Sequence, residues 1–274
     1  MRPILVTGLA LWTPGFASID AFAEGAHDPS VTDCASAWVP ARLLRGASRL
    51  TRMLGESAER ACVAGGADPK TVATVYGSDY GEIETMVILL DTIFRGDGQL
   101  SPMRFKNSVH NAASGLSSIG QGNRSFSTSL AAGRRTFEAS IIEAMALLEE
   151  RGGEVVVAVA DDSLPEPLRQ LEGWEALAVG LCLRSDEAAR AGEPRRVLAT
   201  LGGLAPEEEP SPRATRFSGR AIDPRVSANA VAAAFPLLDA IYSGRAGRVC
   251  LAPDVRGAFA VDVTIGSFAR SPRT

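Results

Sequence analysis

The sequence of this 274-residue chain predicts a layered α/β fold. Short β-branched runs bounded by turn residues alternate with helical stretches of about a dozen residues, a pattern typical of strands paired in parallel through crossover helices. The run from Val155 to Ala158 is apolar at every position, which indicates a strand buried on both faces. Strands are expected at residues 3–9, 71–77, 154–160, 176–183, 196–201, 248–252 and 259–266.

Helices are expected between these strands wherever apolar residues recur at spacings of three, four and seven. The first, residues 40–64, carries such a stripe through Leu43, Ala47 and Leu50. Residues 205–225 contain the polar segment PEEEPSP and few large apolar side chains, so an exposed loop is expected there. The remaining predicted helices are residues 81–94, 136–150 and 228–242.

The composition excludes several functional classes. Lys and Arg number 28 against 32 Asp and Glu, a formal net charge of −4, so the chain lacks the basic field that holds nucleic acid. Its apolar runs are too short to cross a membrane, and residues 1–15 lack the pattern of a signal peptide. Four cysteines without a CxxC pair indicate a reduced protein, and together these features predict a soluble, cytoplasmic chain.

Generic catalytic and cofactor motifs are missing from the sequence. Its two histidines, His27 and His110, cannot build a multi-histidine metal site, and no metal is expected. No GxxxxGK[ST] phosphate loop, GxGxxG turn or GxSxG nucleophile elbow occurs, so no cofactor is expected. Ser125, Ser127 and Ser129 alternate within SFSTS, and we interpret them as one polar face of a strand.

The block of residues 100–161 carries a series of short motifs: an SP pair, an NxAxG helix start and a glycine turn, followed by the apolar strand. It resembles the N-terminal half of a β-ketoacyl synthase, the thiolase-fold condensing enzyme of fatty-acid and polyketide synthesis. The opening ILVTG and the VYGS at residues 75–78 are similar to the family's first strand and VGxGTG turn, so the resemblance covers about the first 185 residues. The matching residues of the block are Ser101, Pro102, Asn111, Ala113, Gly115 and Gly122.

The resemblance implies a thiolase-like, condensing-enzyme fold with α/β/α layers and a reduced second half. Residues 1–274 would form a single ketosynthase-like domain, with the N-terminal-half core at 1–204 and a loop plus a short C-terminal remnant at 205–274. The strings SVHNAA at residues 108–113 and STSLAAG at 127–133 are similar to those of short subunits known as chain-length factors of aryl polyene and related pigment biosynthesis, which pair with a full catalytic ketosynthase.

The sequence departs from this family at the residues that carry its chemistry. Decarboxylative condensation needs a thiolate that carries the acyl chain and two histidines that stabilise the enolate. The ungapped register of the resemblance places Arg134 where the family has its cysteine, and a shift of a few residues finds only Leu130, Ala131, Ala132, Gly133 and Arg135. No cysteine lies between Cys62 and Cys182, and no histidine follows His110. We therefore expect no catalytic residues and no condensation of acyl groups by this chain.

A silent subunit that keeps the fold is expected to act on a partner, here a full-length β-ketoacyl synthase in a heterodimer. In the family, the strand before the nucleophile commonly meets its twin across the dimer axis, which makes Ser125, Ser127 and Ser129 interface candidates. A second segment matches the family's loop toward the partner's acyl tunnel, where a bulky side chain limits product length. This segment consists of Met103, Arg104 and Phe105.

Three further features have two interpretations. His110 and its neighbour Asn111, at the polar start of a helix, are further candidates for the partner interface. His110 either lines a pocket or hydrogen-bonds across the interface, or it is a helix-start side chain that satisfies backbone groups, and we favour the last interpretation. Arg134 and its neighbour Arg135 begin a helix, where their positive charges oppose the helix dipole. The two side chains therefore either face a carboxylate or a bound anion, or they remain solvated. If the fold is that of the family, Arg134 fills the space where the acyl-cysteine would lie. The pair at residues 161–162, both Asp, is expected to cap the turn after its strand.

Four arginines suggest a helix face. Arg42, Arg45, Arg49 and Arg52 recur at spacings of three, four and three, which predicts one stripe of a helix. Such a stripe either docks an acidic acyl carrier protein or forms the solvated face of an amphipathic helix, and we favour the solvated face.

Two other functions compete with the chain-length factor. One is a serine-dependent acyl hydrolase or acyltransferase, in which a serine of residues 125–129 would act with His110, although the sequence supplies no nucleophile elbow. The other is a homodimeric scaffold without a ketosynthase partner. A serine-directed or thioester probe would label the hydrolase or acyltransferase but neither of the other two. The mass of the native complex would distinguish the homodimeric scaffold from a chain-length factor bound to a ketosynthase.

Overall fold

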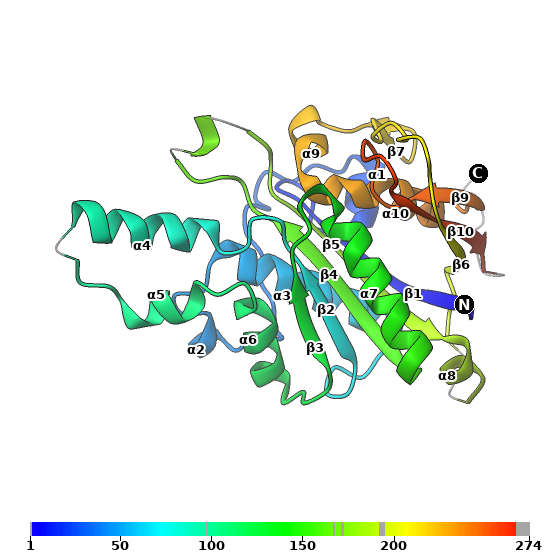
Figure 1. Ribbon diagram of the computed structural model, residues 1–274, viewed down its shortest axis with the longest axis horizontal. Helices are drawn as coiled ribbons and strands as arrows, with labels where there is room; N and C mark the ends of the chain where they lie inside the picture. The colour runs from blue at the N-terminus through cyan, green and yellow to red at the C-terminus, as the bar shows by residue number, and fades with distance from the viewer. Residues whose placement is uncertain (1, 97, 167, 171–172, 192–194, 267–274) are drawn as a thin grey trace.

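The chain is built on one mixed β-sheet. A computed structural model describes residues 2–96, 98–166, 168–170, 173–191 and 195–266 (Figure 1). Eight strands form this sheet in the order β3-β2-β4-β5-β1-β6-β10-β9, and β7 and β8 form a separate two-stranded ribbon. The strands are β1 (Ile4–Trp12), β2 (Ala73–Gly77), β3 (Ser127–Leu130), β4 (Glu154–Asp161), β5 (Leu177–Ser185), β6 (Ala199–Pro206), β7 (Arg216–Phe217), β8 (Arg220–Ala221), β9 (Gly247–Cys250) and β10 (Phe259–Ile265).

The expected parallel pairing holds for one end of the sheet. Strand β2 pairs in parallel with β3 and β4, whereas the pairs from β4 through β5, β1, β6 and β10 to β9 are antiparallel. The prediction of parallel pairing is therefore wrong for most of the sheet. For the β4–β5 pair the physical reason is the connection after β4, in which the described residues form a single short 3₁₀ turn instead of the long crossover helix that a parallel return needs.

Helices cover both faces of the sheet (Figure 1). On one face, α3 packs against β1, β4 and β5, and on the other α7 packs against β2 and β4 while α10 contacts β9 and β10. The helices are α1 (Ile19–Glu24), α2 (Ala41–Leu44), α3 (Arg49–Gly65), α4 (Ile83–Arg95), α5 (Pro102–Asn107), α6 (Ala112–Gln121), α7 (Thr136–Arg151), α8 (Asp186–Ala191), α9 (Pro224–Ala228) and α10 (Phe235–Tyr242).

Strand β4 separates two hydrophobic cores. Val155, Val157 and Val159 point into the core under α7 and α10, while Val156 and Ala158 point into the core under α3. This alternation confirms that the apolar run is a strand buried on both faces, and the layered α/β/α arrangement predicted from the sequence is present.

Helix α3 lies unusually close to the sheet because two strand glycines leave room for its backbone. A Cβ atom at Gly8 of β1 would lie 2.3 Å from the carbonyl oxygen of Ala61, and one at Gly180 of β5 would lie 2.3 Å from that of Ser57. Any larger residue at either position must push the helix away from the sheet.

The predicted helix at residues 40–64 is interrupted. Gly46 adopts a left-handed backbone with φ of 76°, and the Ser48 hydroxyl accepts a hydrogen bond from the Thr51 N–H at 3.0 Å, so a new helix begins there. The predicted helix at 228–242 is likewise divided: α9 ends before Asn229, whose extended backbone leads into a 3₁₀ turn and then α10.

The predicted exposed loop at residues 205–225 is partly structured. Strand β6 extends to Pro206, and the β7–β8 ribbon buries Phe217 against Phe22, Phe235 and Tyr242. Among the helices that the structure describes, none combines the length and apolar character needed to cross a bilayer.

Candidate functional site

Arg134 lies in a one-turn 3₁₀ helix, Gly133–Arg135, that leads directly into α7. The Thr136 hydroxyl fixes this turn, because it donates to the Gly133 carbonyl at 2.7 Å and accepts from the Ala132 N–H at 3.0 Å. The Arg134 side chain is 60% exposed and lies 3.8 Å from the Asp254 carboxylate. Arg134 therefore lies mostly in solvent, beside a carboxylate of its own chain.

A cavity of about 930 Å³ opens beside Arg134. Tyr80 and Trp174 contribute two aromatic rings to its lining, with centroids 5.1 Å apart. The C-terminal part of the chain contributes Arg213, whose Nε lies 2.6 Å from Oδ2 of Asp254. The sequence analysis missed these four residues, and no sequence signal links them, since they come from segments far apart in the chain.

Asp161, at the end of β4, organises the turn after β2. Its buried carboxylate accepts hydrogen bonds from the Ser78 hydroxyl at 2.7 Å and from the backbone N–H groups of Asp79 and Tyr80 at 3.0 and 3.1 Å. Burial raises the pKa of Asp161 to about 7, although these three donors favour its charged form. The expectation that Asp161 caps the turn after its own strand is wrong: it secures a neighbouring turn that reaches the cavity.

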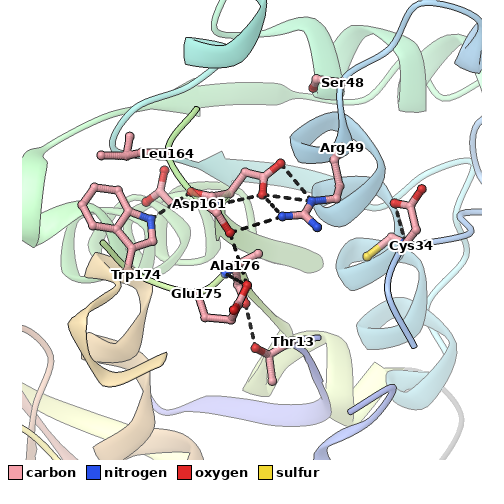
Figure 2. Close-up of polar contacts among 12 residues, drawn as sticks. Thr13, Cys34, Ser48, Arg49, Asp161, Leu164, Trp174, Glu175 and Ala176 are labelled. Atoms are coloured by element: carbon pink, nitrogen blue, oxygen red, sulfur yellow. Dashed lines mark hydrogen bonds and ion pairs between the residues drawn. The ribbon is translucent and has the colours of Figure 1, made fainter. Parts of the chain in front are cut away.

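Asp162 agrees with the expectation, because its carboxylate accepts a hydrogen bond from the Ser163 N–H at 2.6 Å, and it also pairs with Arg49. Figure 2 shows Arg49 and Trp174 approaching the end of β4 near Asp161 from opposite sides. The Arg49 guanidinium contacts the Asp162 carboxylate, and the Trp174 indole N–H donates to the Asp162 carbonyl at 2.9 Å. Hydrogen bonding to this carboxylate raises the pKa of Arg49. These contacts join α3 to the strand end and to one wall of the cavity.

The prediction that four arginines form one stripe of a single helix is wrong. Arg42 lies in α2 and Arg45 at its end, whereas Arg49 starts α3 after the interruption at Gly46. Arg49 and Arg52 are half-buried in ion pairs, the latter with Asp33 at 3.1 Å. Of the four, Arg42 and Arg45 are exposed.

The serines at β3 have partners other than His110. The Ser125 hydroxyl donates to the Thr71 carbonyl at 2.8 Å, Ser127 contacts the Thr74 hydroxyl at 2.8 Å, and Ser129 contacts the Ser114 hydroxyl at 3.2 Å. β3 itself comprises Ser127–Leu130, so Ser125 precedes it. The strand forms one end of the sheet, and among the described residues it pairs on a single side, with β2.

His110 lies before α6 and is directed toward another segment. Its Nε2 lies 2.9 Å from the Ser78 carbonyl oxygen. Its partner is a backbone group, which agrees with the interpretation favoured from the sequence, and that group lies in the turn after β2. Asn111 occupies the N-cap position of α6, and its exposed side chain makes no capping hydrogen bond.

Helices α4 and α5 extend away from the sheet, and we call residues 83–96 and 98–107 the α4–α5 arm (Figure 1). The segment containing Met103, Arg104 and Phe105 was expected to be a loop, but it forms α5, which Ser101 caps by accepting from the Arg104 N–H. Met103 and Phe105 are exposed on it, the latter by 64%. The Ser101-Pro102 pair explains this helix start, since proline is favoured in the first turn.

Helix α4 exposes apolar side chains around much of its circumference. Thr85 and Leu89 are its buried residues, and Phe94 is 80% exposed. The root of the helix is held by Glu82, which accepts hydrogen bonds from the hydroxyls of Ser48 and Thr51 at 2.8 Å and of Thr85 at 3.1 Å. The other exposed apolar residues of α4 are Met86, Ile88, Leu90 and Ile93.

The four cysteines are free and buried, and none lies at the cavity. Burial raises the pKa of the Cys34 thiol far above its usual range, that of Cys62 to about 12 and that of Cys182 to about 11. Within the described ranges, no group of three or more His, Cys, Asp or Glu side chains could hold a metal ion.

The sheet order, the layers and the position of α7 define a thiolase-like fold of the condensing-enzyme class. The model of the family described as beta-ketoacyl synthase, N-terminal domain, matches residues 20–193. The chain therefore belongs to the β-ketoacyl synthase family. No curated protein sequence matches it.

Solved structures confirm this fold. The complex of the ketosynthase ApeO with its chain length factor ApeC from Xenorhabdus doucetiae matches with a TM-score of 0.66 and 18% identity, over 96% of this chain and 100% of that chain. The ishigamide ketosynthase/chain length factor matches with a TM-score of 0.67 and 18% identity, over 97% and 100%. A type II polyketide synthase ketosynthase bound to its acyl-carrier protein, AntDE:AntF, matches with a TM-score of 0.60 and 16% identity, over 77% and 71%.

Proposed function

We propose that the chain is a non-catalytic chain-length factor that pairs with an active β-ketoacyl synthase in polyketide-, aryl polyene- or fatty-acid-type biosynthesis. The observation that carries this proposal is the residue at the family's nucleophile position. There the chain has the exposed guanidinium of Arg134, and its four thiols are buried elsewhere. An arginine cannot form the acyl thioester on which condensation depends.

The histidines support the same conclusion. Condensation needs two imidazoles at the decarboxylating carboxylate, but His110 contacts the Ser78 carbonyl, and His27 packs edge-on against Phe16. Neither histidine lines the cavity at Arg134. A subunit of this composition contributes to condensation through the partner's catalytic residues.

The α4–α5 arm supports the existence of a partner. A helix that is apolar on several faces is stable in water when another surface covers it, and exposed apolar patches of this kind mark interaction sites. The arm lies on the side of the sheet that ends in β3 (Figure 1), so arm and strand together could contact one protein. The solved complexes of this fold pair a ketosynthase with a chain length factor, which is the partner that we propose.

The side chains of α5 are our candidates for shaping the acyl tunnel. Met103 and Phe105 are bulky and exposed, and Arg104 lies between them in sequence. In a tunnel shared with the ketosynthase, such side chains would stop chain growth by occupying the space of further methylene groups.

Several finer elements belong to the same proposal. Residues 1–274 act as a single ketosynthase-like unit, with 205–274 as the remnant of a second half, and the protein works in the cytoplasm. If an acyl carrier protein docks on this chain, the contribution from the four arginines comes from Arg42 and Arg45, which are exposed.

Pairing is tested by co-expression with a candidate ketosynthase followed by gel filtration. We expect a heteromeric complex whose affinity falls at least tenfold in the Phe94→Asp/Phe105→Asp double variant, because charge enters an apolar interface. Val63→Asp is the matched control, since Val63 is 72% exposed on α3, outside the arm. Separate elution of the unmodified subunits would contradict pairing, and a stable homodimer instead would favour the scaffold function.

Catalytic silence is tested on the purified chain with malonyl and acyl thioesters. We expect neither decarboxylation nor elongation, and no labelling by a serine-directed fluorophosphonate, because none of the hydroxyls of Ser125, Ser127 and Ser129 is bonded to His110. Elongation by the chain alone would contradict the proposal. Stoichiometric labelling of one of these serines would instead favour the hydrolase or acyltransferase.

A further inference from the structure

The cavity beside Arg134 has a cation that a ligand can reach. Arg213 and Asp254 form an ion pair that further hydrogen bonds hold in place. The Arg213 guanidinium also donates to the Ser227 carbonyl at 2.6 Å, and the Asp254 N–H donates to the Ser211 carbonyl at 2.8 Å. Arg134 contacts the same carboxylate from 3.8 Å and stays mostly in solvent. An exposed ion pair of this length contributes little, so Arg134 can exchange it for a ligand at low cost.

The remaining lining suits an apolar body. The exposed Tyr80 ring lies beside Trp174, and the indole N–H of Trp174 is already bonded to the Asp162 carbonyl. Pro224, Ala228 and Ile222 add apolar surface. The volume of about 930 Å³ is in the range of pockets for organic molecules and far larger than an inorganic ion requires.

Charge limits the ligand further. Two arginines and two aspartates line the cavity, so a ligand with several negative charges would face the carboxylates of Asp79 and Asp254. A single carboxylate, in contrast, matches the planar fork of one guanidinium.

We infer that this cavity binds an amphipathic monocarboxylate without covalent chemistry, with the carboxylate on Arg134 and the apolar or aromatic body against Tyr80. The site needs no thiol and no partner subunit, so it does not rest on the proposed function. It gives the former nucleophile position a role of its own in ligand binding.

Tryptophan fluorescence of the full chain tests the inference, because Trp174 lies in the cavity wall whereas Trp12 and Trp38 are buried outside it. We expect 3-phenylpropanoate and octanoate to give a saturable change, and 3-phenylpropanamide and inorganic phosphate to give none. Arg134→Gln should weaken carboxylate binding about tenfold, the size expected for a lost charge-assisted pair. Arg124→Gln, an exposed arginine before β3, is the matched control and should bind normally.

Circular dichroism shows whether each variant is folded. Should Arg134→Gln not fold, Arg134→Lys keeps the charge but loses the fork, and it should still bind more weakly than the unmodified chain. Tyr80→Ala should weaken both carboxylates. No saturation by either carboxylate up to about 10 mM, equal binding of acid and amide, binding of phosphate as tight as that of the acids, or equal affinities of the Arg134 and Arg124 variants would each overturn the inference.

Discussion

The sheet body and the α4–α5 arm are both rich in apolar residues, yet they place them differently. In the body, α3 packs Leu50, Met53 and Leu54 against β1, β4 and β5 of its own chain. In the arm, α4 leaves Leu90, Ile93 and Phe94 in solvent. The apolar content of a helix thus predicts that one of its faces is covered, but it does not say whether the covering surface belongs to the same chain.

Matched truncations in the two regions should give the largest contrast. Phe137→Ala removes a fully buried ring from the core under α7, and we expect it to lower the free energy of unfolding by about 3–5 kcal/mol. Phe94→Ala removes an exposed ring and should change the free energy of the isolated chain by no more than about 0.5 kcal/mol. Urea unfolding followed by fluorescence measures both, and equal losses would contradict the division into body and arm.

Two glycine substitutions should change the free energy of unfolding by smaller amounts and in opposite directions. Gly8→Ala forces a methyl group into the backbone of α3 and should destabilise the chain by about 1–3 kcal/mol. Gly115→Ala, in α6 near the arm, meets no atom within 4 Å and should stabilise the chain by about 0.5–1 kcal/mol through better helix propensity. Thermal unfolding gives the sign of each change. A neutral Gly8→Ala would mean that α3 lies farther from β1.

The junction between the two regions should respond to pH. Burial raises the pKa of Asp161 to about 7, above its value near 3.9 in an unfolded chain. Between these pH values the folded state keeps a proton on Asp161 that the unfolded state releases. The contribution of Asp161 to the free energy of unfolding is therefore complete below about pH 4, and it falls by about 1.4 kcal/mol per pH unit as the pH rises to 7. Unfolding free energies from pH 4 to 8 should show this slope in the unmodified chain relative to Asp161→Asn. Parallel curves would contradict the assignment.

The sequence allowed most strands to be predicted because β-branched runs such as β4 carry their own pattern, and the resemblance supplied the layers. The interruption of the predicted helix before α3 was missed because apolar residues keep their helical spacing on both sides of Gly46. The left-handed backbone of Gly46 does not alter that spacing. The antiparallel pairing of β4 with β5 was missed since it depends on the connection after β4, whose described residues form a 3₁₀ turn and no long helix. Patterns of neighbouring residues predict individual helices and strands, whereas both of these errors concern the segments that connect one element to the next.

The candidate site was predictable in part. The resemblance placed Arg134 at the start of α7, and the structure agrees. Its neighbour Asp254 lies in the C-terminal segment, so no spacing rule could join the two. The exposure of α4 was equally hidden, because apolar residues at helical spacing look the same whether the chain itself or another protein covers them.

Glu82 gives the arm a property that matters during encounter with another protein. Its carboxylate ties the first turn of α4 to the hydroxyls of Ser48, the N-cap of α3, and of Thr51 within α3, and α3 packs against the sheet. These bonds set the direction of the arm while the chain is alone. In the complex that we propose, little conformational entropy of the arm would therefore be lost on docking, and association would need no refolding of the arm.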